Sequence, residues 1–176
     1  MRAPFLALAL VLSPGCGPVQ RPDGGSGLLT AAARAPAFSA RDQHGKSHTL
    51  AEFAGRPVVL FFYPKDGTPG CTKEACAFRD RWKELEASGA VLLGVSRDSV
   101  DRHRAFAEEH KLQFLLLSDE DGTICKSYGV GSTFGMASRV TFIIDKTGRV
   151  ARTFPDVSPA THASEVLTAV AALSKE

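Results

Sequence analysis

The chain has 176 residues, of which 44% are hydrophobic and 23% charged, a composition that is ordinary for one globular domain. A formal net charge of +2 without a basic run argues against nucleic acid as a partner. No stretch of about 20 apolar residues is present, so no ordinary membrane-spanning helix is expected. Four cysteines without a CxxC pair indicate neither a disulfide framework nor a zinc ribbon.

The first 16 residues have the pattern of a secretory signal peptide, with Arg2, an apolar run over 3–12 and a small-residue junction. Because Cys16 follows that junction, the ending resembles the lipobox of bacterial lipoproteins, although Ser13 stands where that family usually has leucine. The resemblance implies lipidation of Cys16 and a place on the periplasmic side of a bacterial membrane. A plain secretory signal, or a mis-assigned start of a cytoplasmic protein, stays open as an alternative.

Residues 17–33 are rich in Gly, Pro, Ser and Ala and can bury little apolar surface. We therefore expect a flexible linker there, which would tether a single domain of residues 34–176 to the anchor. Apart from this anchor, no contact with a membrane is expected.

The rest of the chain alternates between strand and helix patterns. In order we expect a hairpin (36–40 and 47–50), a helical turn (50–54), a buried strand (57–63), a helix (71–87), a strand (90–95), a helix (99–110), a strand (114–117), a short helix (122–128), a strand (140–144), its hairpin partner (149–154) and a closing helix (159–173). This alternation predicts an α/β domain with a central mixed sheet flanked by helices, in the order of a thioredoxin-like fold.

The segment between the first buried strand and the helix after it carries the chemistry. Pro64 ends the strand, a tight loop follows, and Cys71 falls at the start of the helix. Unpaired backbone N–H groups at a helix N-terminus carry a partial positive charge, which favours the thiolate form of a cysteine. Since the thiolate is the nucleophile, this placement indicates a reactive cysteine.

The loop itself supplies further polar groups. The hydroxyl of Thr68 is close enough in sequence to reach the Cys71 sulfur or an oxygen bound there, and the N–H groups of Gly70 and Cys71 could donate to the same oxygen. Donors held where negative charge develops are the usual means of stabilising a transition state. Pro64 restricts the loop and helps to shield the pocket from water.

The pattern Pro-x-x-x-Thr-x-x-Cys, formed by Pro64, Thr68 and Cys71, resembles that of peroxiredoxins. The longer string YPKDGTPGCTKEACAFRD is similar to the bacterioferritin-comigratory, or Q-type, subfamily, and the resemblance extends from about residue 35 to the C-terminus. It implies a thioredoxin fold, reduction of hydrogen peroxide and organic hydroperoxides, and recycling by thioredoxin or a thioredoxin-like reductant. It implies no cofactor and no metal, and a monomer.

The resemblance also implies an arginine beside the active cysteine, and the matching position is Arg139. A guanidinium there would favour the thiolate and hold the peroxide oxygens by two bonds. The thiolate of Cys71 would be oxidised to a sulfenic acid. Many members of this subfamily have their resolving cysteine where Cys76 stands, so the resemblance implies a Cys71–Cys76 disulfide.

That disulfide has a consequence for the helix. On an intact helix, Cα atoms five residues apart are separated by roughly 8–9 Å, whereas a disulfide requires less than about 7 Å. We therefore predict that the first turn or two of this helix unwinds in each catalytic cycle.

Other classes of protein stay open as alternatives. One is a permanent structural disulfide between Cys71 and Cys76, which the helical spacing makes awkward. Another is an exported copper chaperone of thioredoxin fold, which would bind metal through two cysteines and a distant histidine such as His162. Those chaperones place three residues between their cysteines, whereas this chain has four. A disulfide oxidoreductase, which would need CxxC, and a non-catalytic domain complete the alternatives.

The remaining polar residues receive plainer interpretations. Cys125 is predicted to be a small core thiol and is left out of the mechanism. Most of the five histidines are predicted to lie at the surface, since their spacing shows no pattern of metal ligands. Glu74 suits the positive end of the helix and is also close enough to bond within the loop, so both interpretations stay open.

Overall fold

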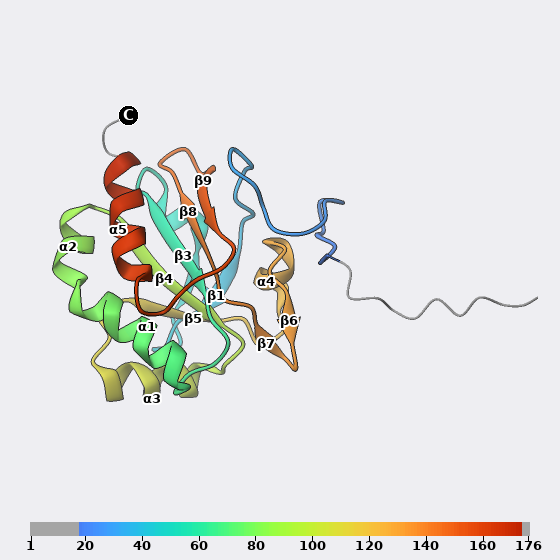
Figure 1. Ribbon diagram of the computed structural model, residues 1–176. Coiled ribbons are helices and arrows are strands. Elements are labelled where there is room, and N and C mark those ends of the chain that lie inside the picture. Colours follow the sequence, from blue (N-terminus) through green and yellow to red (C-terminus); the bar gives the residue numbers. More distant parts are fainter. Residues whose placement is uncertain (1–17, 174–176) are drawn as a thin grey trace, which may run out of the picture.

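The computed structural model describes residues 18–173, so the predicted leader with Cys16 lies outside the described residues. A seven-stranded sheet forms the centre of the domain, with helices on both of its faces (Figure 1). In spatial order its strands are β2 (Ser47–Thr49), β1 (Ser39–Arg41), β5 (Leu115–Ser118), β4 (Val91–Ser96), β3 (Val58–Phe62), β8 (Val140–Ile144) and β9 (Val150–Phe154).

The helices follow the strands along the chain. They are the 3₁₀ turn η1 (Leu50–Phe53), α1 (Pro69–Asp80), α2 (Trp82–Ala87), α3 (Val100–His110), α4 (Thr123–Ser127) and α5 (His162–Leu173); β6 (Ser132–Thr133) and β7 (Met136–Ala137) form a separate small hairpin. Within residues 18–173, no helix is both long and apolar enough to cross a membrane.

The sheet is mixed, as predicted. Its central strands β3, β4 and β5 run parallel, and β8 joins the other side of β3 in the antiparallel direction. All five residues of β3 are buried, because this apolar run lies between two layers of side chains. The carboxyl ends of parallel strands meet at one edge of a sheet, and the loop that leads to Cys71 starts there.

Alternate residues of β3 face the two halves of the core. Val59 and Phe61 pack with residues of α1, α2, α3 and α5 on one face. Leu60 and Phe62 pack with α4 and the N-terminal segment on the other. Cys71 belongs to the first half of the core, so the first face carries the site.

The segment predicted as a free tether lies partly against the domain. Leu29 is 3% exposed, and its N–H group donates to the carbonyl of Tyr128 at 3.3 Å. The N–H group of Ala32 donates to the carbonyl of Val150 at 2.8 Å. The expectation of a free linker up to residue 33 is therefore corrected, because Leu29 supplies an apolar anchor and the edge strand β9 offers backbone partners.

The single helix predicted over 71–87 is also corrected. Helix α1 begins at Pro69, after the N-cap residue Thr68, and ends before Arg81, whose φ of −106° and ψ of 17° separate it from α2. The Arg81 guanidinium bonds both to Glu84 and to the hydroxyl of Ser164 in α5. A tertiary contact at this position thus interrupts a helical pattern that is continuous in the sequence.

Candidate active site

Cys71 is the third residue of α1 and is only 2% exposed. Local features favour a helix start at this point. Thr68 has extended backbone angles, and Pro69 occupies the first helical position. The N–H group of Thr72 donates to the carbonyl of Thr68 at 2.8 Å. The N–H groups of the first turn have no acceptor within a helix, so they concentrate partial positive charge at the start of α1, where Cys71 stands.

Arg139 reaches Cys71 from the neighbouring strand. The antiparallel register of β3 and β8 sets Phe62 opposite Val140, so Arg139 lies at the sheet edge from which the Cys71 loop departs. Its Nη2 donates to the Cys71 sulfur at 3.2 Å. The structure thus brings together the two residues that the resemblance paired.

Gly70 makes room for this guanidinium. A Cβ atom at this position would lie 3.3 Å from Arg139 Nη2 and 3.9 Å from Cγ of Pro159. The first of these contacts is tighter than ordinary packing, so a larger residue at position 70 would require the guanidinium or the loop to shift.

Glu74 completes a three-part contact with Cys71 and Arg139. It is 1% exposed, and its carboxylate accepts a hydrogen bond from Nη1 of Arg139. Burial raises the pKa of the Glu74 carboxyl to about 7, although Arg139 opposes the shift. Burial would lower the pKa of Arg139, yet Glu74 and the Cys71 sulfur outweigh it and the pKa is raised. Glu74 therefore bonds Arg139 and not a group within the loop, so its contact differs from the one that the sequence suggested.

This buried carboxyl predicts a pH dependence of stability. The pKa of Glu74 is about 7 in the folded protein against an ordinary value of 4.5, so the folded state binds the proton more tightly. Relative to Glu74→Gln, the protein with Glu74 should lose stability as the pH rises from 4.5 through about 7. Urea unfolding between pH 4 and pH 8, with Cys71→Ser in both proteins to remove thiolate effects, measures this difference. A difference in unfolding free energy that is constant across this range would contradict the assignment.

The other predicted residues of the loop and helix make no hydrogen bond to the Cys71 sulfur in the described part of the chain. The Thr68 hydroxyl donates to the Lys65 carbonyl at 3.0 Å, so in this state it bonds within the loop and not to the sulfur. Pro64 is half-buried beside the loop. Cys76 is partly exposed on α1, and both it and Cys71 are free thiols on one continuous helix.

Cys125 lies in the other half of the core. It is 3% exposed and packs on the face of the sheet opposite to Cys71, which confirms the prediction of a small core thiol. Burial raises the pKa of its thiol, and the nearby Asp119 carboxylate adds to the shift. Both the position and the protonated state keep Cys125 out of the chemistry at Cys71.

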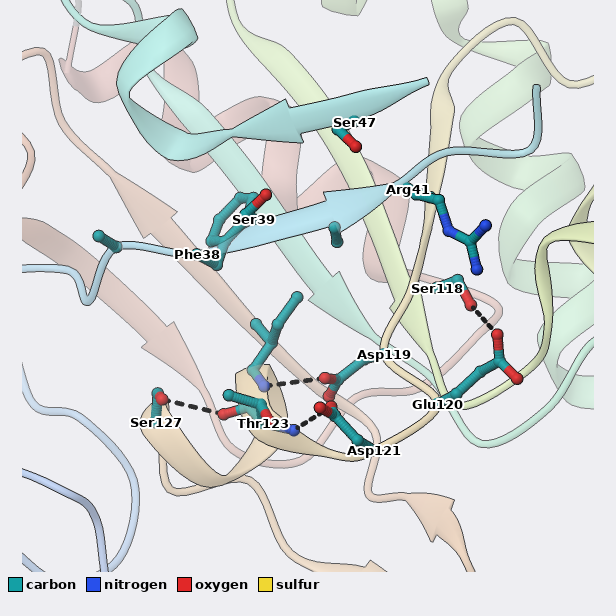
Figure 2. A pocket seen from close by; sticks show the side chains of 13 residues that line it. Phe38, Ser39, Arg41, Ser47, Ser118, Asp119, Glu120, Asp121, Thr123 and Ser127 are labelled. Atoms are coloured by element: carbon teal, nitrogen blue, oxygen red, sulfur yellow. Dashed lines mark hydrogen bonds between the residues drawn. The ribbon is translucent and has the colours of Figure 1, made fainter. Parts of the chain in front are cut away.

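A surface hollow lies between β1 and α4 (Figure 2). Its lining residues Phe38 and Ile124 belong to the same half of the core as Cys125. Its acidic groups are already bonded, since Asp119 accepts the N–H groups of Ile124 and Cys125 and Asp121 accepts that of Thr123. These carboxylates hold the start of α4, so the hollow adds nothing to the chemistry at Cys71.

The prediction that most histidines lie at the surface is wrong for three of them. His48, His103 and His162 are 6%, 0% and 0% exposed, because each has polar or aromatic partners inside the fold. His162 bonds Thr141 at 2.8 Å, and burial lowers its pKa to about 4. Among residues 18–173, no group of three or more His, Cys, Asp or Glu side chains is placed to hold a metal ion. The copper alternative therefore finds no support.

Sequence reasoning missed a buried network behind the loop. The Asp66 carboxylate accepts hydrogen bonds from Tyr63 and from His103, each at 2.7 Å. One signal was available, because His103 lies on the apolar stripe of its helix together with Val100 and Phe106. A polar residue within such a stripe indicates a buried partner.

Three comparisons relate this chain to known proteins. A model described as the AhpC/TSA family matches residues 31–153. A Coxiella burnetii protein that carries the name peroxiredoxin bcp is 43% identical over 141 residues, covering 76% of this chain and 93% of that protein. The chloroplastic peroxiredoxin Q of Sedum lineare is 44% identical over 142 residues, covering 79% of this chain and 76% of that protein. The crystal structure of peroxidoxin BcpB from Mycobacterium tuberculosis has a TM-score of 0.78 at 36% identity, covering 82% of this chain and 98% of that one.

Proposed function

Because the chain belongs to the AhpC/TSA family, and within it to the peroxiredoxin Q (bcp) group, we propose that it reduces hydroperoxides through Cys71. The substrates are hydrogen peroxide and organic hydroperoxides, and the reductant is of the thioredoxin type. The observation that carries the residue assignment is the 3.2 Å contact between Arg139 Nη2 and the Cys71 sulfur at the start of α1.

The first step is attack by the Cys71 thiolate on the terminal peroxide oxygen. An S–O bond forms, the O–O bond breaks, and the leaving oxygen takes a proton to become water or an alcohol, which leaves a sulfenic acid. Arg139 and the N–H groups of the first turn stabilise the charge as it moves from sulfur to oxygen. Thr68 assists once its hydroxyl turns from the Lys65 carbonyl towards a bound oxygen.

The second step resolves the sulfenic acid. The Cys76 thiolate attacks the Cys71 sulfur, and an S–S bond forms as the S–O bond of the sulfenic acid breaks. The departing hydroxide takes a proton and leaves as water. A reduced dithiol of the thioredoxin type then reduces this disulfide by thiol–disulfide exchange, which restores both thiols and oxidises the dithiol. Cys76 suits this role because it is partly exposed on the same helix, five residues from Cys71.

We also propose that the protein is an exported lipoprotein and a monomer. Export rests on the pattern of residues 1–16 with Cys16 at its end. When cells are grown with a radioactive fatty acid, the protein should become radioactive. The variant Cys16→Ala should carry no radioactivity. Label retained in Cys16→Ala, or absent from both proteins, would overturn the anchor without touching the peroxidase.

Thiol mapping tests the peroxidase directly. Protein without residues 1–17 is reduced, treated with one equivalent of hydrogen peroxide and digested for mass spectrometry. We expect two thiols to disappear within seconds and a Cys71–Cys76 cross-link to form, while Cys125 stays alkylatable. A sulfenic acid held at Cys71 would keep the peroxidase but remove Cys76 from it, and no reaction within minutes would overturn the function.

A further inference from the structure

The loop that presents Cys71 contains a charged side chain turned into the core. Asp66 lies between β3 and α1, yet it is only 5% exposed. One oxygen of its carboxylate accepts the Tyr63 hydroxyl at 2.7 Å, and the other lies 2.7 Å from Nδ1 of His103 in α3. Tyr63 and His103 are 2% and 0% exposed, so all three side chains of this arrangement are buried.

The backbone of the loop is held as well. The N–H group of Asp66 donates to Oδ2 of Asp98 at 2.8 Å, just beyond the end of β4. Asp98 in turn accepts the Ser96 hydroxyl at 2.7 Å and Nε of Arg102 at 2.9 Å. The loop is therefore bound both through a side chain and through its main chain to the end of β4 and the first half of α3.

The contacts identify which nitrogen of His103 carries the proton. Nδ1 faces a carboxylate oxygen at 2.7 Å, whereas Nε2 is buried without a hydrogen-bond partner in the described part of the chain. A carboxylate only accepts, so Nδ1 must donate. The Tyr63 hydroxyl is used in its bond to Asp66, and its 3.4 Å separation from Nδ1 makes it a neighbour only.

Such a network costs free energy, because its polar groups are removed from water. A buried carboxylate is tolerated only with its donors in place, and well-packed apolar residues often give equal or greater stability. Polar groups retained in a buried position instead specify a single arrangement. Here that arrangement sets the loop that carries Thr68 and ends at Cys71.

We propose that Asp66 and His103 are positioning residues, which hold the Cys71 loop in its peroxide-reactive geometry. This inference rests on the proposed peroxidase function. The partners of Asp66 in this network are Tyr63, directly after β3, Asp98, two residues after β4, and His103 in α3, and none of them lies in α1. The anchor therefore keeps its partners when α1 unwinds to let Cys71 meet Cys76, and it returns Cys71 to the same place afterwards.

Two reactions of Cys71 separate positioning from reactivity. Peroxide requires the oriented donors of the loop, whereas alkylation by iodoacetamide requires mainly an accessible thiolate. In His103→Leu, the rate constant for peroxide should fall about 10- to 100-fold, since a displacement near 1 Å has effects of this order. Alkylation should change much less. The ratio of the two rate constants is the readout, measured on reduced protein with Cys125→Ser.

Matched variants sharpen the comparison. His103→Asn places an amide N–H near the position of Nδ1 and should restore most of the ratio. His110→Leu makes the same change later on α3, at a half-buried residue outside the network, and should leave the ratio unchanged. If His103→Leu does not fold, Tyr63→Phe removes one donor to Asp66 and retains the ring, and it should lower the ratio in the same direction.

The outcomes distinguish this inference from the function on which it rests. The positioning role would be overturned if the ratio of the two rate constants were unchanged in His103→Leu, or if it were as low in His103→Asn as in His103→Leu. Asp66 and His103 would then have a purely structural role. Failure of the unsubstituted protein to react with peroxide would instead overturn the peroxidase. A lower melting temperature with an unchanged ratio also counts against positioning.

Discussion

Replacing Arg139 by Gln should lower the rate constant for oxidation of Cys71 by hydrogen peroxide by about 10²- to 10³-fold. The guanidinium donates to the sulfur at 3.2 Å, and its side chain is only 17% exposed, so solvent screens its charge weakly. Glutamine removes both the charge and the paired donors that could hold two peroxide oxygens. Rapid-quench alkylation followed by mass spectrometry of the Cys71 peptide measures the rate.

A second consequence of this change must be separated from the first. Loss of Arg139 leaves the buried Glu74 carboxylate without its cation, which by itself destabilises the helix start. The double variant Arg139→Gln, Glu74→Gln removes that stranded group. If the rate of the double variant stays low, the loss belongs to the contact with Cys71.

The neighbouring strand offers a control for Arg139. Arg152 lies on β9 opposite Ile143, is exposed, and stacks on the Phe154 ring at 4.7 Å. Arg152→Gln changes the net charge equally and should alter the peroxide rate less than about twofold, because exposed charges are strongly screened. Equal losses in the two variants would show a general effect of charge and would remove Arg139 from the reaction.

Local patterns in the sequence were sufficient for the strand and for the start of the helix. The run from Val58 to Phe62 has no alternation of polar residues, which is typical of a strand buried on both faces, and the structure buries all five residues. The position of Arg139 beside Cys71 was not available from such patterns. It depends on the antiparallel register of β3 and β8, and here only the family resemblance pointed to it.

The features that sequence reasoning missed depend on distant partners. The break between α1 and α2 occurs at Arg81, whose bond to Ser164 joins residues 83 positions apart. The Asp66–His103 bond joins residues 37 positions apart. At Arg81 the local periodicity indicated a continuous helix. At His103 the prediction of a surface residue rested on the spacing of the five histidines and overlooked the apolar stripe to which His103 belongs. Tertiary contacts outweigh helix propensities of a few tenths of a kcal/mol per residue.

Oxidation of the protein to its Cys71–Cys76 disulfide should increase hydrogen exchange at the backbone N–H groups of residues 72–77 by at least about 100-fold. In the reduced protein, both cysteines lie on the continuous helix α1, which spans Pro69–Asp80. Helical geometry separates their Cα atoms by roughly 8–9 Å, and a disulfide allows less than about 7 Å. The bond therefore requires that the intervening helical hydrogen bonds open.

The structure also predicts where the opening stops. On one side, Asp66 is held by Tyr63, His103 and Asp98. On the other, Arg81 already interrupts the helix and is held to α5 through Ser164. Peptides from β3 and from α2 should keep their protection in the oxidised protein, so that the change is confined to residues between these two points.

One further sample and an internal reference make the exchange experiment decisive. Cys76→Ser treated with one equivalent of peroxide carries an oxidised Cys71 without a disulfide, and its α1 should stay protected. Peptides of α3 serve as an internal reference in every sample. Equal protection over residues 72–77 in the two redox states, with the cross-link established by mass spectrometry, would contradict unwinding. The disulfide would then have to form by a change in the loop before Pro69, and that change would require the Asp66 anchor to release.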